Sequence, residues 1–334
     1  RSRATVFNMI HQELQKPEVQ MLKDLILNTG SETFNSVSKM TVERFDMEMK
    51  ELVRQNGEAK DNVKFLNTLE RQFKNLQSND FTIVEKTLPS LLKGLKVVFI
   101  ISRHFKSDER ISSLLVTISN ELCNKIESII DIRVIFGEIE QIPEESVLEE
   151  FKNKIVHGRN ILALWKMLFE STKEKLEEDG GDRWDFDQKP IKERPEHLIK
   201  VLDNFKDVIE GMKKFVVLLG PQLKAVTGNT EKIDELILKV KGLSRIFLQV
   251  HFNPFDKINY QKIKSLIVEY NTSTKEINEK TIKLIETTFA DLRSSESAFE
   301  LLQKFINLQS LDHISEQLQK RYSNVLSTYL KELN

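Results

Sequence analysis

The sequence contains very few of the residues that interrupt regular structure. Eleven glycines and seven prolines are spread over 334 residues. Between them, apolar residues recur three and four positions apart, which is the period of one face of an α-helix. The alternation of apolar and polar residues that would indicate strands is almost absent. The scarcity of breakers therefore predicts an all-α fold with long helices.

Other absences limit the environment and the partners of the chain. The single cysteine, Cys123, excludes an internal disulfide framework and fits a reducing compartment. The 50 basic and 51 acidic residues are interspersed and leave a net charge of -1, so no long-range field attracts nucleic acid or acidic lipid. The longest apolar runs, "VVFII" and "FVVLL", are far shorter than the roughly 20 residues of a membrane helix. We expect no nucleic-acid partner and no membrane partner.

Motifs typical of catalytic, cofactor and metal sites are also missing. The glycine-containing loops at 177–185 and 225–234 lack the GxxxxGK[ST] pattern that cradles phosphate. The six histidines are far apart and form none of the spacings typical of zinc ligands. Carboxylates such as Glu149 and Glu177 alternate with lysines, a pattern typical of solvated helix surface. We therefore expect no catalytic residue, no cofactor, no metal and no enzyme activity in this region.

The positions of the breaks predict roughly ten to twelve helices joined by short connections. Such an arrangement is typical of an elongated stack of helical bundles with long antiparallel helices. Three parts are expected within it: N-terminal bundles over 1–137, a middle bundle over 138–250, and a C-terminal bundle of long helices over 251–334. Because the chain begins without Met and inside an apparent helix, we expect it to be a piece of a longer polypeptide.

The middle part contains a corner at "GGDRWDFD", where a long helix with an apolar face over 147–176 is predicted to end. Gly180 and Gly181, the only Gly-Gly pair, allow the chain to leave that helix. Trp184 and Phe186 lie two positions apart in the extended segment that follows, so both project to one side. We expect them to fill the joint between two bundles. The alternative is an exposed aromatic anchor for a partner protein.

A second corner is predicted at "LLGPQ". Gly220 ends an apolar helix there, and Pro221 opens a short new helix at the position that proline favours. The expected role of this corner is structural, because it sets the angle between two helices. The same alternative, a partner-binding surface, applies to it.

Six strings in a fixed order carry a family resemblance that is more specific than helical periodicity. Together they resemble the N-terminal tail (stem) region of axonemal dynein heavy chains, from about residue 55 to the end of the chain. The strings are "DNVKFLNTLERQFKNL" (61–76), "LPSLLKGLKVVFIISRHFKSDERISSLLVTISNELCNKI" (88–126), "GGDRWDFDQKPIKER" (180–194), "LLGPQLKAVTGNTEKID" (218–234), "FNPFD" (252–256) and "LRSSESAFELLQKF" (292–305).

The resemblance implies a non-catalytic segment of a motor protein's tail. In such heavy chains the ATPase ring lies far C-terminal of this region, so the parent chain would be a microtubule motor ATPase although this segment is not an enzyme. The implied partners are other dynein heavy chains, WD-repeat intermediate chains with their light chains, and docking factors on doublet microtubules. The implied location is the axoneme of a cilium or flagellum, where the tail is a scaffold for ciliary motility.

A second class of protein shares the long helices and the balanced charge. It is the helical tethering or coat-type rod of membrane traffic, which also needs no catalytic group. Such a rod is not expected to reproduce the six ordered strings, so the dynein tail is the favoured interpretation.

Because the sequence contains no phosphate cradle, we expect that the 334-residue chain neither binds nor hydrolyses nucleotide. Equilibrium binding of labelled ATP in the presence of magnesium checks this expectation. Saturable binding at micromolar ATP would contradict it.

Overall fold

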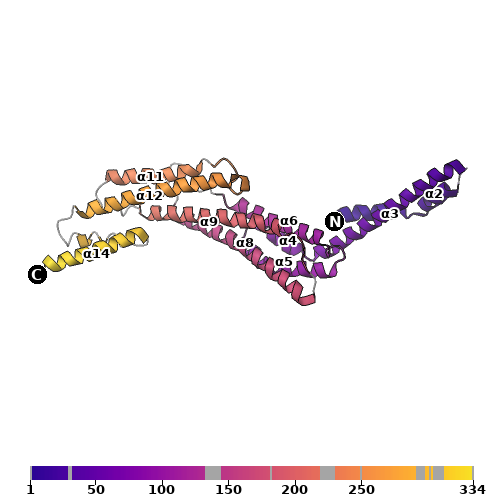
Figure 1. Cartoon of the computed structure of the whole chain (residues 1–334), viewed down its shortest axis with the longest axis horizontal. Coiled ribbons are helices and arrows are strands. Elements are labelled where there is room, and N and C mark those ends of the chain that lie inside the picture. Colours follow the sequence, from indigo (N-terminus) through magenta and orange to yellow (C-terminus); the bar gives the residue numbers. More distant parts are fainter. Residues whose placement is uncertain are drawn as a thin grey trace. The chain divides into compact units, whose positions relative to one another are not determined.

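The computed structural model describes residues 2–28, 32–131, 144–180, 183–218, 230–248, 250–290, 298–300, 302–303 and 312–332. Within these ranges all regular elements are helical (Figure 1), which confirms the predicted all-α class. The elements are α1 (Ser2–Leu14), α2 (Pro17–Asn28), α3 (Glu32–Asn67), α4 (Glu70–Leu76), α5 (Phe81–Ile101), α6 (Asp108–Ile129), α8 (Glu145–Gly180), α9 (Lys189–Leu218), α11 (Thr230–Leu248), the 3-10 turn η1 (Lys257–Asn259), α12 (Tyr260–Ala290) and α14 (Asp312–Glu332).

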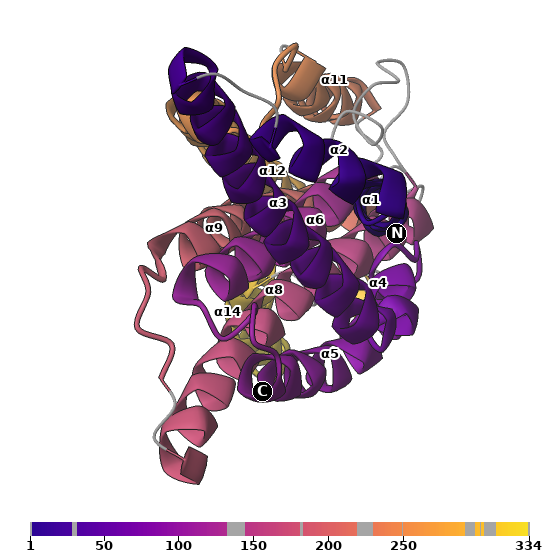
Figure 2. The same cartoon turned by 90° about the vertical axis from the view of Figure 1, so that its right-hand side faces the viewer.

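The chain forms two compact units. Unit 1 comprises Arg1–Glu121 and Leu164–Lys192, and unit 2 comprises Leu122–Ala163 and Glu193–Asn334. In unit 1, α1 and α2 both pack against α3 (Figure 2), and α4 packs against α5. In unit 2, α11 and α12 lie side by side (Figure 1). The three-part division expected from the sequence stays a prediction.

The long helices bury side chains at alternating spacings of three and four residues, and α9 buries Val201, Val208 and Phe215 in addition to its first row. This spacing keeps the row on one face and is the pattern of coiled-coil packing. In α8 the row starts at Leu148, whereas Val147, which the predicted face included, is 44% exposed. The buried rows include Leu148, Phe151, Ile155, Leu162, Trp165 and Phe169 of α8; Leu198, Leu202, Phe205, Ile209 and Met212 of α9; Ile233, Leu236, Val240, Leu243 and Phe247 of α11; and Ile263, Ile267, Tyr270, Ile277, Thr281 and Leu284 of α12.

Ion pairs between facing helices show that α8 and α9 run antiparallel. As residue numbers rise along α8, the numbers of their partners on α9 fall by the same amount. The pairs are Glu149 with Lys213 (2.9 Å), Lys152 with Glu210 (3.1 Å) and Arg159 with Asp203 (2.8 Å). Such partly exposed pairs contribute only about 0.2–1 kcal/mol each. They therefore mark the register of the helices rather than supply most of their stability.

A glycine allows α12 to approach α9 closely. A Cβ atom on Gly211 would lie 2.9 Å from the Tyr270 hydroxyl oxygen, closer than packed atoms tolerate. The Tyr270 hydroxyl donates to the Val208 carbonyl at 2.9 Å, and the Tyr270 side chain is only 1% exposed. Burial raises the pKa of Tyr270 above its ordinary value, so the hydroxyl keeps its proton at neutral pH.

A buried hydroxyl group compensates for a proline inside α9. Pro195 has no N–H, so the Ile191 carbonyl, four positions earlier, loses its helical donor. The Ser119 hydroxyl on α6 donates to that carbonyl at 2.7 Å. Ser119 is 1% exposed, and water cannot easily replace it. The proline and the serine therefore act as a pair, although they are far apart in the sequence.

This pairing predicts a non-additive result. Ser119→Ala should lower the free energy of unfolding by about 1–2 kcal/mol, because it leaves a buried carbonyl unpaired. In a Pro195→Ala background the backbone N–H returns, and the same change should cost less than about 0.5 kcal/mol. Chemical denaturation of the four proteins in this double-mutant cycle measures both values. Ser112→Ala, on the same helix, is the control. Equal costs of Ser119→Ala in both backgrounds would show that the hydroxyl does not replace the missing donor.

Candidate functional site

The corner after α8 is an aromatic cluster in unit 1, centred on Trp184. The indole is 1% exposed and stacks on Phe169 of α8, with ring centroids 5.5 Å apart. Its edge contact with Phe99 of α5 has a centroid distance of 6.2 Å. The Phe186 ring, 6.0 Å from the indole, is half-buried. The cluster thus joins two helices to the segment between α8 and α9.

The start of α9 fixes the far end of this segment. The Asp187 carboxylate accepts from the Lys189 backbone N–H at 2.9 Å, and such a bond satisfies a donor at the first turn of a helix. In the same turn, Lys192 places its amine 5.5 Å from the centre of the Phe169 ring and pairs with Glu170. The Phe169 ring and the Glu170 carboxylate both attract the Lys192 amine and so favour its position. The outer side of the aromatic cluster is therefore covered by a charged pair.

Apolar contact dominates the chemistry of this corner. The Trp184 indole nitrogen is buried and has no hydrogen-bond partner among the described residues. The indole therefore stabilises the corner through burial and ring contacts. Each aromatic pair adds about 0.5–1.5 kcal/mol to the stabilisation that comes from the buried area. The described surroundings of the indole offer neither an acid–base pair nor a nucleophile.

Of the other predicted corner residues, the structure describes only Gly180. Gly180 is the last residue of α8, so that helix ends where the sequence predicts. Gly181, Gly220 and Pro221 lie outside the described residues. That the two corners act as structural joints stays a prediction, with a partner-binding anchor as the alternative.

The sequence alone does not indicate the two rings that enclose Trp184 in the corner. Phe169 lies within the helix predicted to have an apolar face over 147–176, but nothing in its local pattern pairs it with a residue fifteen positions later. Phe99 lies within the apolar run "VVFII", where periodicity indicates burial without naming a partner. Both contacts depend on how α5 and α8 pack.

The potentially reactive groups are held in unreactive states. Burial raises the pKa of the Cys123 thiol to about 12, so the thiol stays protonated and is a poor nucleophile at neutral pH. The Lys213 amine lowers the pKa of Glu149 by a hydrogen bond, and the Lys154 amine does the same for Glu150.

Across the part of the chain that the structure describes, no group of three or more His, Cys, Asp or Glu side chains could hold a metal ion. None of the described helices is long and apolar enough to cross a bilayer.

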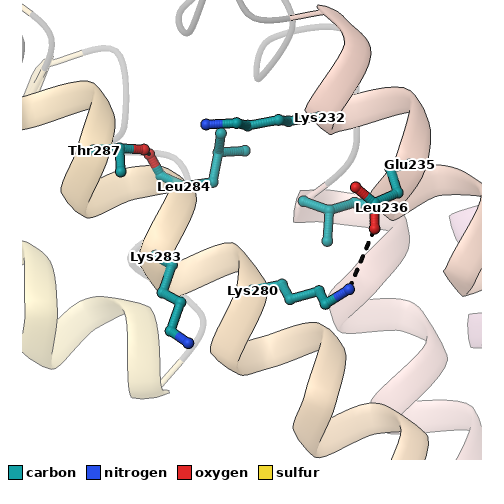
Figure 3. A pocket seen from close by; sticks show the side chains of 7 residues that line it. All are labelled: Lys232, Glu235, Leu236, Lys280, Lys283, Leu284 and Thr287. Atoms are coloured by element: carbon teal, nitrogen blue, oxygen red, sulfur yellow. Dashed lines mark hydrogen bonds and ion pairs between the residues drawn. The ribbon is translucent and has the colours of Figure 1, made fainter.

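A shallow hollow between α11 and α12 is the second candidate surface. It has a volume of about 210 Å³, and Figure 3 shows lysines around its rim, with Leu236 and Leu284 between them. The Lys280 amine donates to Glu235 at 3.2 Å (Figure 3), and this hydrogen bond is the largest cause of the lowered pKa of Glu235. Lys283 points away from that pair in the same view. The hollow therefore has a charged rim but no set of side chains that converges on one point.

Together, the fold and these surfaces define a structural segment built from paired, coiled-coil-like helices. Comparison with known proteins places it in a family. Residues 1–334 match the family model described as "Dynein heavy chain, N-terminal region 1". The chain therefore belongs to the dynein heavy chains and corresponds to their N-terminal region.

The relatives include axonemal and flagellar heavy chains. The Dynein-1-alpha heavy chain of the flagellar inner arm I1 complex from Chlamydomonas reinhardtii is 31% identical over 333 residues, which cover 99% of this chain and 7% of that relative. Human Dynein axonemal heavy chain 10 is 32% identical over 272 residues, which cover 81% of this chain and 6% of that relative. The Dynein gamma chain of the Chlamydomonas reinhardtii flagellar outer arm is 20% identical over an alignment that covers 100% of this chain and 7% of that relative. The chain thus spans less than a tenth of these relatives.

The aromatic corner predicts a large loss of stability in one variant. Trp184→Ala should lower the free energy of unfolding by about 3–5 kcal/mol, because it removes a fully buried indole and leaves a cavity. Phe186→Ala, at a half-buried position, is the matched variant and should cost only about 1–2 kcal/mol.

Thermal unfolding, beside a pull-down of dynein intermediate chains, separates a joint from an anchor. An unchanged melting curve for Trp184→Ala, combined with lost binding, would show that the corner is a partner anchor.

Proposed function

We propose that this chain is a non-catalytic scaffold segment in the tail of an axonemal dynein heavy chain. The observation that carries the proposal is the repeated burial of side chains three and four positions apart along α8, α9, α11 and α12. Such burial makes long helix pairs that resist bending. Membership of the N-terminal region of dynein heavy chains supports the assignment to the tail.

Association with a second heavy chain is part of this proposal. Two relatives, the Dynein-1-alpha and Dynein-1-beta heavy chains of Chlamydomonas reinhardtii, both carry the name of the flagellar inner arm I1 complex. Related heavy chains are thus named as members of one complex. The balanced surface charge of this chain also suits protein interfaces, whose cores are depleted of charge and whose rims are polar.

The further partners that we propose are WD-repeat intermediate chains, their light chains and docking factors on doublet microtubules. The proposed location is the axoneme of a cilium or flagellum, in line with the names of the relatives. In this role the parent heavy chain supplies the ATPase activity elsewhere in its length. The segment described above holds the motor in its assembly.

The two corners fit the same role as fixed joints. Trp184 is enclosed by rings from α5 and α8, and a packed indole resists changes in the angle of the chain at that point. We propose that Trp184 and Phe186, with Gly180 and Gly181, set one such angle. Gly220 and Pro221 are proposed to set the other.

A buried charge in the full-length heavy chain tests the scaffold role. Leu202 of α9 is fully buried, so Leu202→Asp should disrupt unit 2 because an unpaired buried carboxylate is costly. We expect less intermediate chain to co-precipitate with the heavy chain, whereas the rate of ATP hydrolysis by the ring changes little. Lys200→Asp, at an exposed position of the same helix, is the control and should preserve co-precipitation.

Co-precipitation that is unaffected by Leu202→Asp would contradict the scaffold proposal. A parallel fall in the intrinsic rate of ATP hydrolysis would contradict the separation of this segment from the catalytic part. Measurements on one preparation of the full-length chain decide both questions.

A further inference from the structure

The first three helices form a hairpin that leaves apolar side chains uncovered. α1 and α2 both pack against α3, but α1 contains no buried residue. Val6 and Ile10 are 53% and 41% exposed, and Leu14 follows at the same four-residue spacing along one side of α1. Residues four apart lie on one face of a helix. This side of α1 is therefore an apolar line that no described element of the chain buries.

The apolar line leads to a hollow at the break between α1 and α2. α1 ends at Leu14, and α2 starts at Pro17, which cannot continue the preceding helix without a break. Leu14, at the end of α1, and residues of α3 line a hollow at this place. The hollow has a volume of about 260 Å³. Its apolar lining is formed by Leu14, Phe45, Met49 and Leu52.

Two carboxylates give the hollow a negative rim. Glu51 accepts from Arg54 at 2.6 Å and from Gln55 at 2.8 Å, and chiefly the hydrogen bond from Arg54 lowers the pKa of Glu51 to about 2. Glu48 also lines the hollow, is exposed, and has no ion-pair partner among the described residues. The hollow therefore combines an apolar floor with a negative charge at its edge, which no described residue of the chain pairs.

The chain itself shows what kind of side chain suits this combination. Lys23 of α2 places its amine 6.0 Å from the centre of the Phe45 ring and donates to the Asp46 carboxylate at 2.6 Å. Its alkyl stem is long enough to follow the apolar surface while its charged end reaches a carboxylate. The hollow offers the same ring, Phe45, together with a different carboxylate, Glu48. A second basic side chain therefore complements it.

We propose that the α1–α3 hairpin binds an amphipathic helix of a partner protein, and that the apolar face of this helix is flanked by lysine or arginine. The apolar face would lie along Val6, Ile10 and Leu14, and a basic side chain would enter the hollow and pair with Glu48. Binding of an amphipathic helix in an apolar groove is a common recognition mode, and Met49, with its flexible side chain, adapts to different occupants. The inference adds a partner surface to the scaffold role and depends only on the hairpin.

Two synthetic helices serve as probes. One is a fluorescein-labelled 18-residue helix of leucine, alanine and lysine, with leucines on one face, and the other has glutamate in place of each lysine. Fluorescence anisotropy with the 334-residue chain measures their affinities. We expect the lysine helix to bind at micromolar concentration and the glutamate helix to bind at least about tenfold more weakly, because like charges then face each other.

Two pairs of variants locate the binding. Glu48→Lys should weaken binding of the lysine helix by about tenfold. Glu43→Lys, about 140° away around α3, should change it by less than about twofold. Ile10→Ala should weaken binding by about threefold through lost apolar contact. Met47→Ala, at an exposed position about 160° around α3 from both Phe45 and Met49, should leave the affinity unchanged. Circular dichroism checks that each variant keeps its helix content.

Three results would overturn the inference. The first is absence of binding by the lysine helix, and the second is equal binding of both helices. The third is an equal effect of Glu43→Lys and Glu48→Lys, which would indicate unspecific attraction of charge. Each result leaves the co-precipitation test of the scaffold role unaffected, so the two proposals fail separately.

Discussion

Burial of one apolar side chain at every third or fourth position is the constraint on which the rest of this structure depends. This burial extends along α8, α9, α11 and α12 and turns one face of each helix toward a neighbour. Each buried side chain contributes about 1.5–3 kcal/mol relative to an exposed one, several times the contribution of a partly exposed ion pair. The ion pairs between α8 and α9 then follow from a register that apolar packing has already set.

The outer faces of these helices have a different task. Their charges are balanced, and some of them pair between neighbouring turns or facing helices, as with Lys213, which contacts both Glu145 and Glu149. Because these pairs add little stability, substitutions on the outer faces leave the fold intact. Sequence identity between heavy chains can therefore fall to 20% across the whole region. Such freedom allows related chains to present different surfaces on a common helical framework.

Helix class and the end of α8 could be predicted because they depend on local sequence, whereas the break expected at 54–61 was wrong, because α3 continues through it to Asn67. The period of three and four predicts the helices, and glycine predicts the end of α8 at Gly180. The error at Val147 arose because two neighbouring apolar residues, Val147 and Leu148, fit a helical face almost equally well. Only the packing of the partner helix selects Leu148 for the core.

The candidate sites were predictable only in part, because they depend on contacts between distant segments. Trp184 was identified from its place after the Gly-Gly pair, but Phe99 and Phe169 enter the corner through the packing of α5 and α8. The hollow beside Glu48 lies at the break before Pro17, which the sequence shows, and is lined by residues of α3, whose placement the sequence does not show. Local patterns indicate which residues lie at corners, whereas tertiary packing decides what each corner contacts.

The hydrogen bond from Ser119 to the Ile191 carbonyl also constrains the evolutionary history of the chain. Without the proline at position 195, the backbone N–H occupies that carbonyl, and a serine at position 119 has little effect. Without the serine, a proline at position 195 leaves the carbonyl unpaired in the interior, a defect that selection removes. The easier order of substitution is therefore serine first and proline second. Once both are present, loss of the serine leaves the carbonyl unpaired, whereas loss of the proline restores the backbone N–H, so the constraint between two positions more than seventy residues apart runs in one direction only.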